Sequence, residues 1–164
     1  MPLDADPVAE ARRNWEKHGW EDPGAMVAAT SIARAHQIML AAIDAALTPF
    51  GLTFSRFEAL ALLSFSRRGS LPMGKIGDRL QVHPASVTNT VTRLERDGLV
   101  LRVTGDSDRR TVLAQITPRG RRVARDAARA LADARFGMDG LDAADLDGVP
   151  EALVPRRRPA GDFR

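Results

Sequence analysis

The chain has 164 residues, of which 44% are hydrophobic, and its 24 basic and 21 acidic side chains give a net charge of +3. This length predicts one domain, or one small domain with a dimerisation appendage. The lack of cysteine excludes disulfides and cysteine catalysis, and the three scattered histidines indicate no metal or other cofactor. No apolar run approaches the roughly 20 residues of a membrane span, and the N-terminus has no secretory signal, so we expect a cytoplasmic protein without a membrane partner.

Two helices are predicted in the first third of the chain. Residues 7–19 form a short amphipathic helix, with Pro7 in its first turn and Gly19 at its end. Residues 25–47 form a long helix whose apolar stripe is broad for a small domain. A stripe of this width indicates that a second chain covers part of it.

The middle of the chain predicts a winged helix-turn-helix, in which two short helices joined by a tight turn precede a β-hairpin. Ser55 and Glu58 have the spacing of a capping box, and Thr53 is an alternative helix cap. The expected elements are a helix from Thr53 or Ser55, a polar loop at 67–70, a helix from Pro72, a helix from His83-Pro84, and strands at 99–103 and 111–116.

The C-terminal part is predicted to be helical and interrupted. Thr117 caps a fifth helix that begins at Pro118 and runs to about Phe136, and Asp142 caps a short sixth helix. Proline removes a helical hydrogen bond, so three prolines argue against one long helix at the end of the chain. These prolines are Pro150, Pro155 and Pro159.

The charge is concentrated in the segment with the helix-turn-helix pattern. Residues 67–125 hold 13 basic and 5 acidic side chains, a net charge of +8, whereas residues 1–24 carry −3 and residues 126–164 carry −2. A DNA-binding surface requires such a concentration of positive charge. A solvated basic face is the alternative, but the coincidence with the motif favours double-stranded DNA as the partner.

The helix after Pro84 has the composition of a base-reading helix. Its apolar residues face inward and leave small polar residues outside, although Ser and Thr are mediocre helix formers and a poor choice for a plain surface. Asn pairs with adenine and Arg with guanine, while Ser and Thr contact base edges or phosphates. Ordinary helix-surface polarity is the alternative. The predicted base-reading residues are Ser86, Thr88, Asn89, Thr90 and Arg93.

Further DNA contacts are predicted on either side of that helix. The hairpin tip carries Asp108, Arg109 and Arg110, and adjacent arginines on an exposed turn suit insertion into a minor groove. A local salt bridge between Asp108 and one arginine is compatible with that role. Four other cations are predicted to bind phosphates: Arg67, Arg68, Lys75 and Arg79.

These motifs together strongly resemble the MarR family of transcriptional regulators. The resemblance rests on LTFSRFEALALL, PMGKIGDRL, HPASVTNTVTRLERDGLV and DRRTVLAQITPRG, and covers about residues 26–146. It implies a mainly α fold with a small β-hairpin wing, and a homodimer that offers one helix-turn-helix to each half of a pseudo-palindromic operator. Two departures are Gln81, where the family often has Gly, and Asn89, where it often has Arg or another large polar residue.

The resemblance also divides the chain into four segments. Residues 1–24 form an accessory helix and linker, and residues 25–51 a dimerisation helix. Residues 52–117 form the winged helix-turn-helix lobe, and residues 118–164 the C-terminal dimerisation helices and tail.

A small aromatic or anionic effector is implied by the same resemblance, since many members of the family are released from DNA by such ligands. Trp15, His36 and Arg56 are the candidate effector-binding residues. In the alternative interpretation, Trp15 and Trp20 fasten the accessory helix to the dimer core, and Arg56 faces solvent or phosphate.

The function predicted is therefore that of a sequence-specific transcriptional regulator, most simply a repressor released by its effector. A non-specific architectural protein of the nucleoid is the alternative. The chain has no metalloprotease motif, phosphate-binding glycine loop or nucleophile elbow, so an enzyme is not expected.

Overall fold

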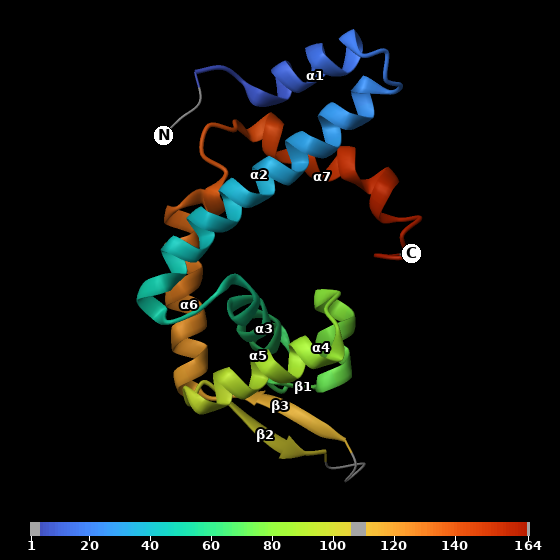
Figure 1. Ribbon diagram of the computed structural model, residues 1–164. Coiled ribbons are helices and arrows are strands. Elements are labelled where there is room, and N and C mark those ends of the chain that lie inside the picture. Colours follow the sequence, from blue (N-terminus) through green and yellow to red (C-terminus); the bar gives the residue numbers. More distant parts are fainter. Residues whose placement is uncertain (1–3, 106–110, 164) are drawn as a thin grey trace.

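A computed structural model describes residues 4–105 and 111–163 of the chain (Figure 1). The elements in chain order are α1 (Pro7–Lys17), α2 (Pro23–Leu47), η1 (Thr48–Phe50), α3 (Phe54–Phe65), β1 (Ser70–Pro72), α4 (Met73–Leu80), α5 (Pro84–Arg96), β2 (Val100–Thr104), β3 (Val112–Ile116), α6 (Pro118–Asp133), η2 (Arg135–Gly137) and α7 (Ala143–Arg157). The fold is mainly α with a small antiparallel sheet, as the sequence predicted.

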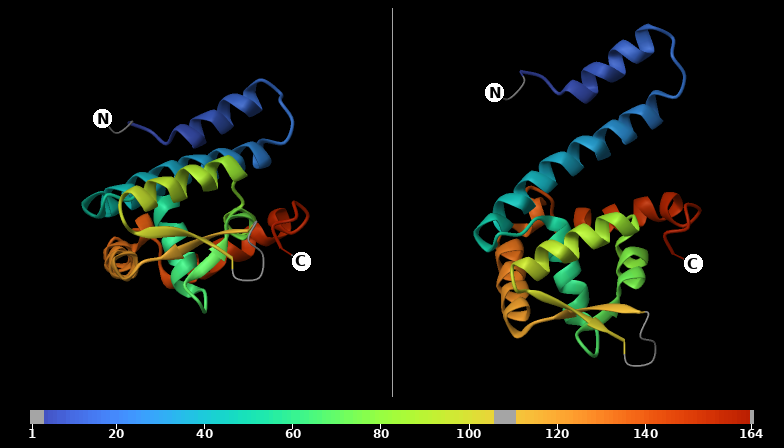
Figure 2. Two further views of the ribbon diagram at one scale, coloured as in Figure 1. Left: turned by 90° about the horizontal axis from the view of Figure 1, so that it is seen from below. Right: turned by 60° about the horizontal axis from the view of Figure 1, so that its bottom comes forward.

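The helix-turn-helix lobe is built around one apolar core. Helices α3, α4 and α5 pack on a sheet of order β1-β3-β2, in which Leu71 and Arg102 both lie opposite Ala114. The β2–β3 hairpin lies beside α5 (Figure 2). Strand β1 was not predicted, because three residues following a polar loop carry too little periodicity to indicate a strand. The fully buried side chains of this core include Leu60, Leu63, Ile76, Val91, Leu94 and Val100.

Most helix ends have the caps that the sequence indicates. The hydroxyl of Thr117 accepts a hydrogen bond from the Gly120 amide at 2.9 Å, and Asp142 forms a capping box with Asp145. The prediction for the start of α3 was wrong in detail. Thr53 occupies the N-cap position, but neither its side chain nor that of Ser55 forms a capping hydrogen bond. Instead, the Phe54 amide donates to Asp44 Oδ1 at 3.0 Å, which ties α3 to the end of α2.

The interruption expected at the C-terminal prolines is not observed. Helix α7 continues through Pro150 and Pro155 to Arg157. No residue of α7 is buried, so solvent reaches the carbonyl groups that the two prolines leave without a donor. Exposure removes most of the penalty on which the prediction depended.

Helix α2 corrects a second expectation, because with η1 it is long and apolar enough to span a membrane by length and composition, and little of it is buried. Three side chains within it, Arg34, His36 and Asp44, are costly inside a bilayer. Its end far from the sheet packs against α1 (Figure 1). An exposed apolar helix with interspersed ionisable residues fits a protein partner better than lipid.

Candidate nucleic-acid interface

Helix α5 divides cleanly into an inner and an outer face. Val87, Val91 and Leu94 are buried in the lobe core. His83 Nδ1 accepts a hydrogen bond from the Ala85 amide at the start of the helix, and Pro84 occupies its first turn. Four of the predicted base-reading residues lie toward the start of α3: Ser86, Asn89 and Arg93 are exposed, and Thr90 is half-buried. Thr88 is also exposed, but it lies on the side of the helix that meets β2.

A polar hollow of about 210 Å³ joins this outer face to the start of α3. Its lining comprises Thr53, Ser55, Arg56, Ser86, Asn89, Thr90 and Arg93. Arg56 lies 3.6 Å from Asp97 Oδ2, and its Nε donates to Thr53 Oγ1 at 3.4 Å. The structure thus places Arg56 beside the predicted base-reading residues, where two guanidinium groups line a shallow polar surface.

The hydroxyl of Thr88 is already used as a donor. Its Oγ1 donates to the Pro84 carbonyl at 3.1 Å, one turn earlier in the helix. What it presents outward is therefore lone pairs and a methyl group. In a major groove these suit the amino group of adenine or cytosine and the methyl group of thymine.

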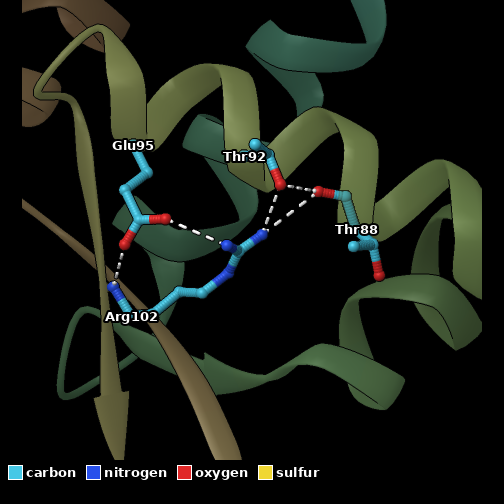
Figure 3. Close-up of polar contacts among 4 residues, drawn as sticks. All are labelled: Thr88, Thr92, Glu95 and Arg102. Carbon is cyan, nitrogen blue, oxygen red and sulfur yellow. Dashed lines mark hydrogen bonds and ion pairs between the residues drawn. The ribbon is translucent and has the colours of Figure 1, made fainter.

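Strand β2 contributes a polar side chain that the sequence interpretation missed. Arg102 Nη1 lies 3.0 Å from Glu95 Oε2, and its Nη2 donates to Thr92 Oγ1 and to the Thr88 carbonyl (Figure 3). The available signal was the alternation of the strand, which puts Arg102 on the same face as the buried Val100 and therefore toward α5.

The predicted phosphate contacts lie in two places, on α4, which packs against α5, and in the loop that leads into β1, the sheet edge opposite β2. Arg67 and Arg68 are exposed in the loop before β1, and Lys75 and Arg79 are exposed on α4. The predicted wing residues Asp108, Arg109 and Arg110 lie outside the described part of the chain.

The turn between α4 and α5 has an unusual residue and an unusual neighbour. Gln81 ends α4 in the left-handed conformation with φ 51°, a region that favours glycine. Its side-chain amide donates to Asp162 Oδ1, and Asp162 also pairs with Arg157. The C-terminal tail therefore contacts the helix-turn-helix lobe, which the sequence did not indicate.

The candidate effector residues are not gathered in one place. Trp15 Nε1 donates to the Glu21 carbonyl at 2.8 Å, and its ring packs edge-on against Trp20 with centroids 4.8 Å apart. His36 is exposed in the middle of α2. These contacts fasten α1 to the linker before α2, and the attachment of the accessory helix to the dimer core stays a prediction.

A larger apolar hollow lies between α3 and α6, with a volume of about 530 Å³. The aromatic rings of Phe57 and Phe65 and the guanidinium groups of Arg121 and Arg125 are among its lining residues. Ser64 also lines it, and the Ser64 hydroxyl is buried with no hydrogen-bond partner among the described residues.

Burial raises the pKa of Glu58, a half-buried residue of α3, above its ordinary value of 4.5. Within residues 4–105 and 111–163, no group of three histidine or carboxylate side chains has a geometry suited to a metal ion.

Known proteins similar to this chain include MarR family transcriptional regulators. The MarR family model matches residues 52–112. Sco5413, a MarR family transcriptional regulator from Streptomyces coelicolor, is 50% identical in sequence. The similarity covers 85% of this chain and 97% of that protein, and its crystal structure superposes with a TM-score of 0.79.

Two further similarities are more distant. The HTH-type transcriptional regulator MhqR of Bacillus subtilis (strain 168) is 37% identical over 70 residues, which are 43% of this chain and 47% of MhqR. The chain thus spans about half the length of this curated relative. CouR from Rhodococcus jostii RHA1, whose crystal structure contains bound p-coumaroyl-CoA, is 25% identical over 81% of this chain and 91% of its own, with a TM-score of 0.69.

Proposed function

The chain belongs to the MarR family of DNA-binding transcriptional regulators, and we propose that it is a homodimeric repressor of a specific, pseudo-palindromic operator. The family consists of regulators and not of enzymes, in agreement with the sequence prediction. In this proposal residues 52–117 read DNA, while residues 25–51 and 118–164 supply the dimer contacts.

The observation that carries the proposal is the outer face of α5. Five small or planar polar side chains project from a helix whose inner face is locked into the lobe core. A rigid helix with an exposed polar face fits a major groove, and the surrounding segment has a net charge of +8 that attracts phosphates. The base-reading set comprises Ser86, Thr88, Asn89, Thr90 and Arg93.

The homodimer is supported by apolar surface that the single chain leaves uncovered. Ile32 and Ile38 on α2 are 51% and 67% exposed, and Leu146 and Val149 on α7 are 38% and 42% exposed. Soluble proteins bury such surface in an interface. Two-fold symmetry then places two α5 helices about 34 Å apart, one turn of DNA.

A competition experiment distinguishes a specific regulator from a nucleoid protein. Duplexes are selected from a random pool by the purified full-length protein, and the selected duplex then competes with a scrambled duplex of equal composition. We expect the selected duplex to bind at least about 10³-fold more tightly at physiological salt. Affinities within a small factor of each other would overturn the proposal and support the architectural alternative.

We also propose that a small aromatic anion releases the protein from its operator, through the apolar hollow between α3 and α6. The volume of about 530 Å³ is that of a small-molecule site, and Arg121 and Arg125 supply positive charge. CouR from Rhodococcus jostii RHA1 binds p-coumaroyl-CoA. We expect aromatic carboxylates to raise the melting temperature of the wild type but not of Arg125→Gln, and to weaken operator binding; equal responses from the two proteins would contradict this site.

A further inference from the structure

Arg102 joins two elements that are both expected to touch DNA. It lies on β2, the edge strand that leads toward the predicted wing arginines, and its guanidinium group lies on α5. The groups it contacts on α5 come from Thr88, Thr92 and Glu95 (Figure 3). These positions follow the three- and four-residue spacing of one helix face, so the side chain spans two turns of the helix.

Glu95 binds Arg102 through both of its carboxylate oxygens. Oε2 lies 3.0 Å from Arg102 Nη1, and Oε1 accepts the Arg102 backbone amide at 3.1 Å. The amide bond fixes the strand itself, and the guanidinium bond fixes the side chain. Bidentate contacts of this kind define an orientation as well as a distance.

The position of Glu95 is unfavourable for DNA binding by itself. Its negative charge lies in the last turn of α5, where the helix dipole disfavours anions, and within the segment of net charge +8. Its contacts with Arg102 account for a carboxylate at this place. Thr92 has a matching role: its hydroxyl donates to the Thr88 carbonyl at 2.7 Å and accepts from Arg102.

We propose that Arg102 is a positioning residue for DNA reading, which clamps β2 to the Thr88–Thr92 turn so that the wing and α5 engage one operator in fixed register. The clamp rests on the proposed function, because it determines specificity only in a protein that reads a sequence. Arg102 influences DNA binding indirectly, by fixing the positions of Thr88 and of β2. Its guanidinium group binds Glu95, Thr88 and Thr92 of α5 and does not bind a phosphate.

The test compares three variants, Arg102→Gln, Arg102→Lys and Glu95→Gln, with a matched control. The control is Arg96→Gln, at an exposed arginine of α5 next to Glu95. Each full-length variant is measured with the duplex that the wild type selects and with its scrambled counterpart. A merely structural role lowers both affinities equally, through the active fraction. A positioning role changes their ratio.

We expect Arg102→Gln and Glu95→Gln each to lower the ratio of selected to scrambled affinity about tenfold, a change typical of coupled neighbours. The double variant Arg102→Gln/Glu95→Gln should have the same ratio as Arg102→Gln alone. The ratio of Arg102→Lys should lie between those of Arg102→Gln and the wild type, and Arg96→Gln should keep the wild-type ratio. The loss in Glu95→Gln is diagnostic, because removing a negative charge otherwise favours binding to any DNA.

In the binding measurements, two results would overturn the clamp. One is a uniform weakening in Arg102→Gln with the salt slope reduced by about one, the signature of a phosphate contact. The other is an unchanged or higher ratio in Glu95→Gln.

Hydrogen exchange of the free protein separates the clamp from the proposed function. The Arg102 amide and the rest of β2 should exchange faster in Glu95→Gln and Arg102→Gln than in Arg96→Gln. Unchanged exchange overturns the clamp even if the operator is read normally. Failure of the wild type to prefer its selected duplex overturns the proposed function, and with it the role of the clamp in specificity.

Discussion

The helix-turn-helix lobe and the helices α2 and α7 beside it differ in how much of their apolar surface is buried. In the lobe, α3, α4, α5 and the sheet enclose a core in which Leu60, Val91 and Leu94 are fully buried. In the 25 residues of α2, only Ile43 and Leu47 are buried, and α7 has no buried residue. The lobe core is enclosed, with Ile43 and Leu47 of α2 among its members, whereas most of α2 and all of α7 are left uncovered, and in the proposed homodimer a second chain covers part of that surface. This difference separates residues that determine stability from residues that determine assembly.

The largest expected effect is on the lobe core. Leu60→Ala should lower the free energy of unfolding by about 2–5 kcal/mol, because the side chain is 0% exposed and its loss leaves a cavity. Urea titration measures it. The control is Leu101→Ala on β2, which is 52% exposed and should change stability by less than about 0.5 kcal/mol. Similar losses in both variants would mean that the lobe is not the stable unit.

The second effect is on assembly. Ile38→Asp places a charge on the exposed apolar face of α2 and should weaken dimer association by at least about 2 kcal/mol, or about 30-fold in Kd. Sedimentation equilibrium measures it. Gln37→Asp adds the same charge at the neighbouring polar position and should leave the dimer largely intact. A dimer equally stable in both variants contradicts the assignment of α2 to the interface.

The sequence predicted the lobe better than it predicted the surfaces around it. The burial of Val87, Val91 and Leu94 could be predicted, because the apolar residues of a helix that face a core recur every three or four positions. The contact of Arg102 with Glu95 and the contact of Gln81 with Asp162 could not be predicted from residue spacing, because each joins residues from separate elements. Helix α7 was expected to break because the proline penalty was judged without knowing that the helix is exposed.

The third prediction concerns base reading. Asn89→Ala should reduce affinity for the selected duplex by about 1–3 kcal/mol and relax base preference at one position of each half-site. Arg79→Ala, on α4, should instead weaken binding to all sequences and lower the salt slope by about one. Binding titrations against single-base variants of the duplex separate the two patterns. Uniform weakening in Asn89→Ala would assign this side chain to a phosphate.

The smallest effect is on pH dependence. Burial raises the pKa of Glu58 in the folded protein above 4.5, so its contribution to stability is fully present below the ordinary carboxyl pKa and is lost as pH rises through the raised value. Glu58→Gln removes that loss and should raise stability at pH 7 by less than about 0.5 kcal/mol, since the residue is only half-buried. Urea titrations at pH 4 and pH 7 measure the difference. A greater benefit at pH 4 would contradict the sign of the shift.

The proposed division between a DNA-reading lobe and dimerisation helices is tested most directly by a hydroxyl-radical footprint of the wild type on its selected duplex. Two protected regions related by a dyad, with centres about one helical turn apart, are the expected result, because two α5 helices carried by one dimer reach successive major grooves on one face of DNA. Protection of a single half-site, or uniform protection without a dyad, would contradict a dimeric and sequence-specific reader.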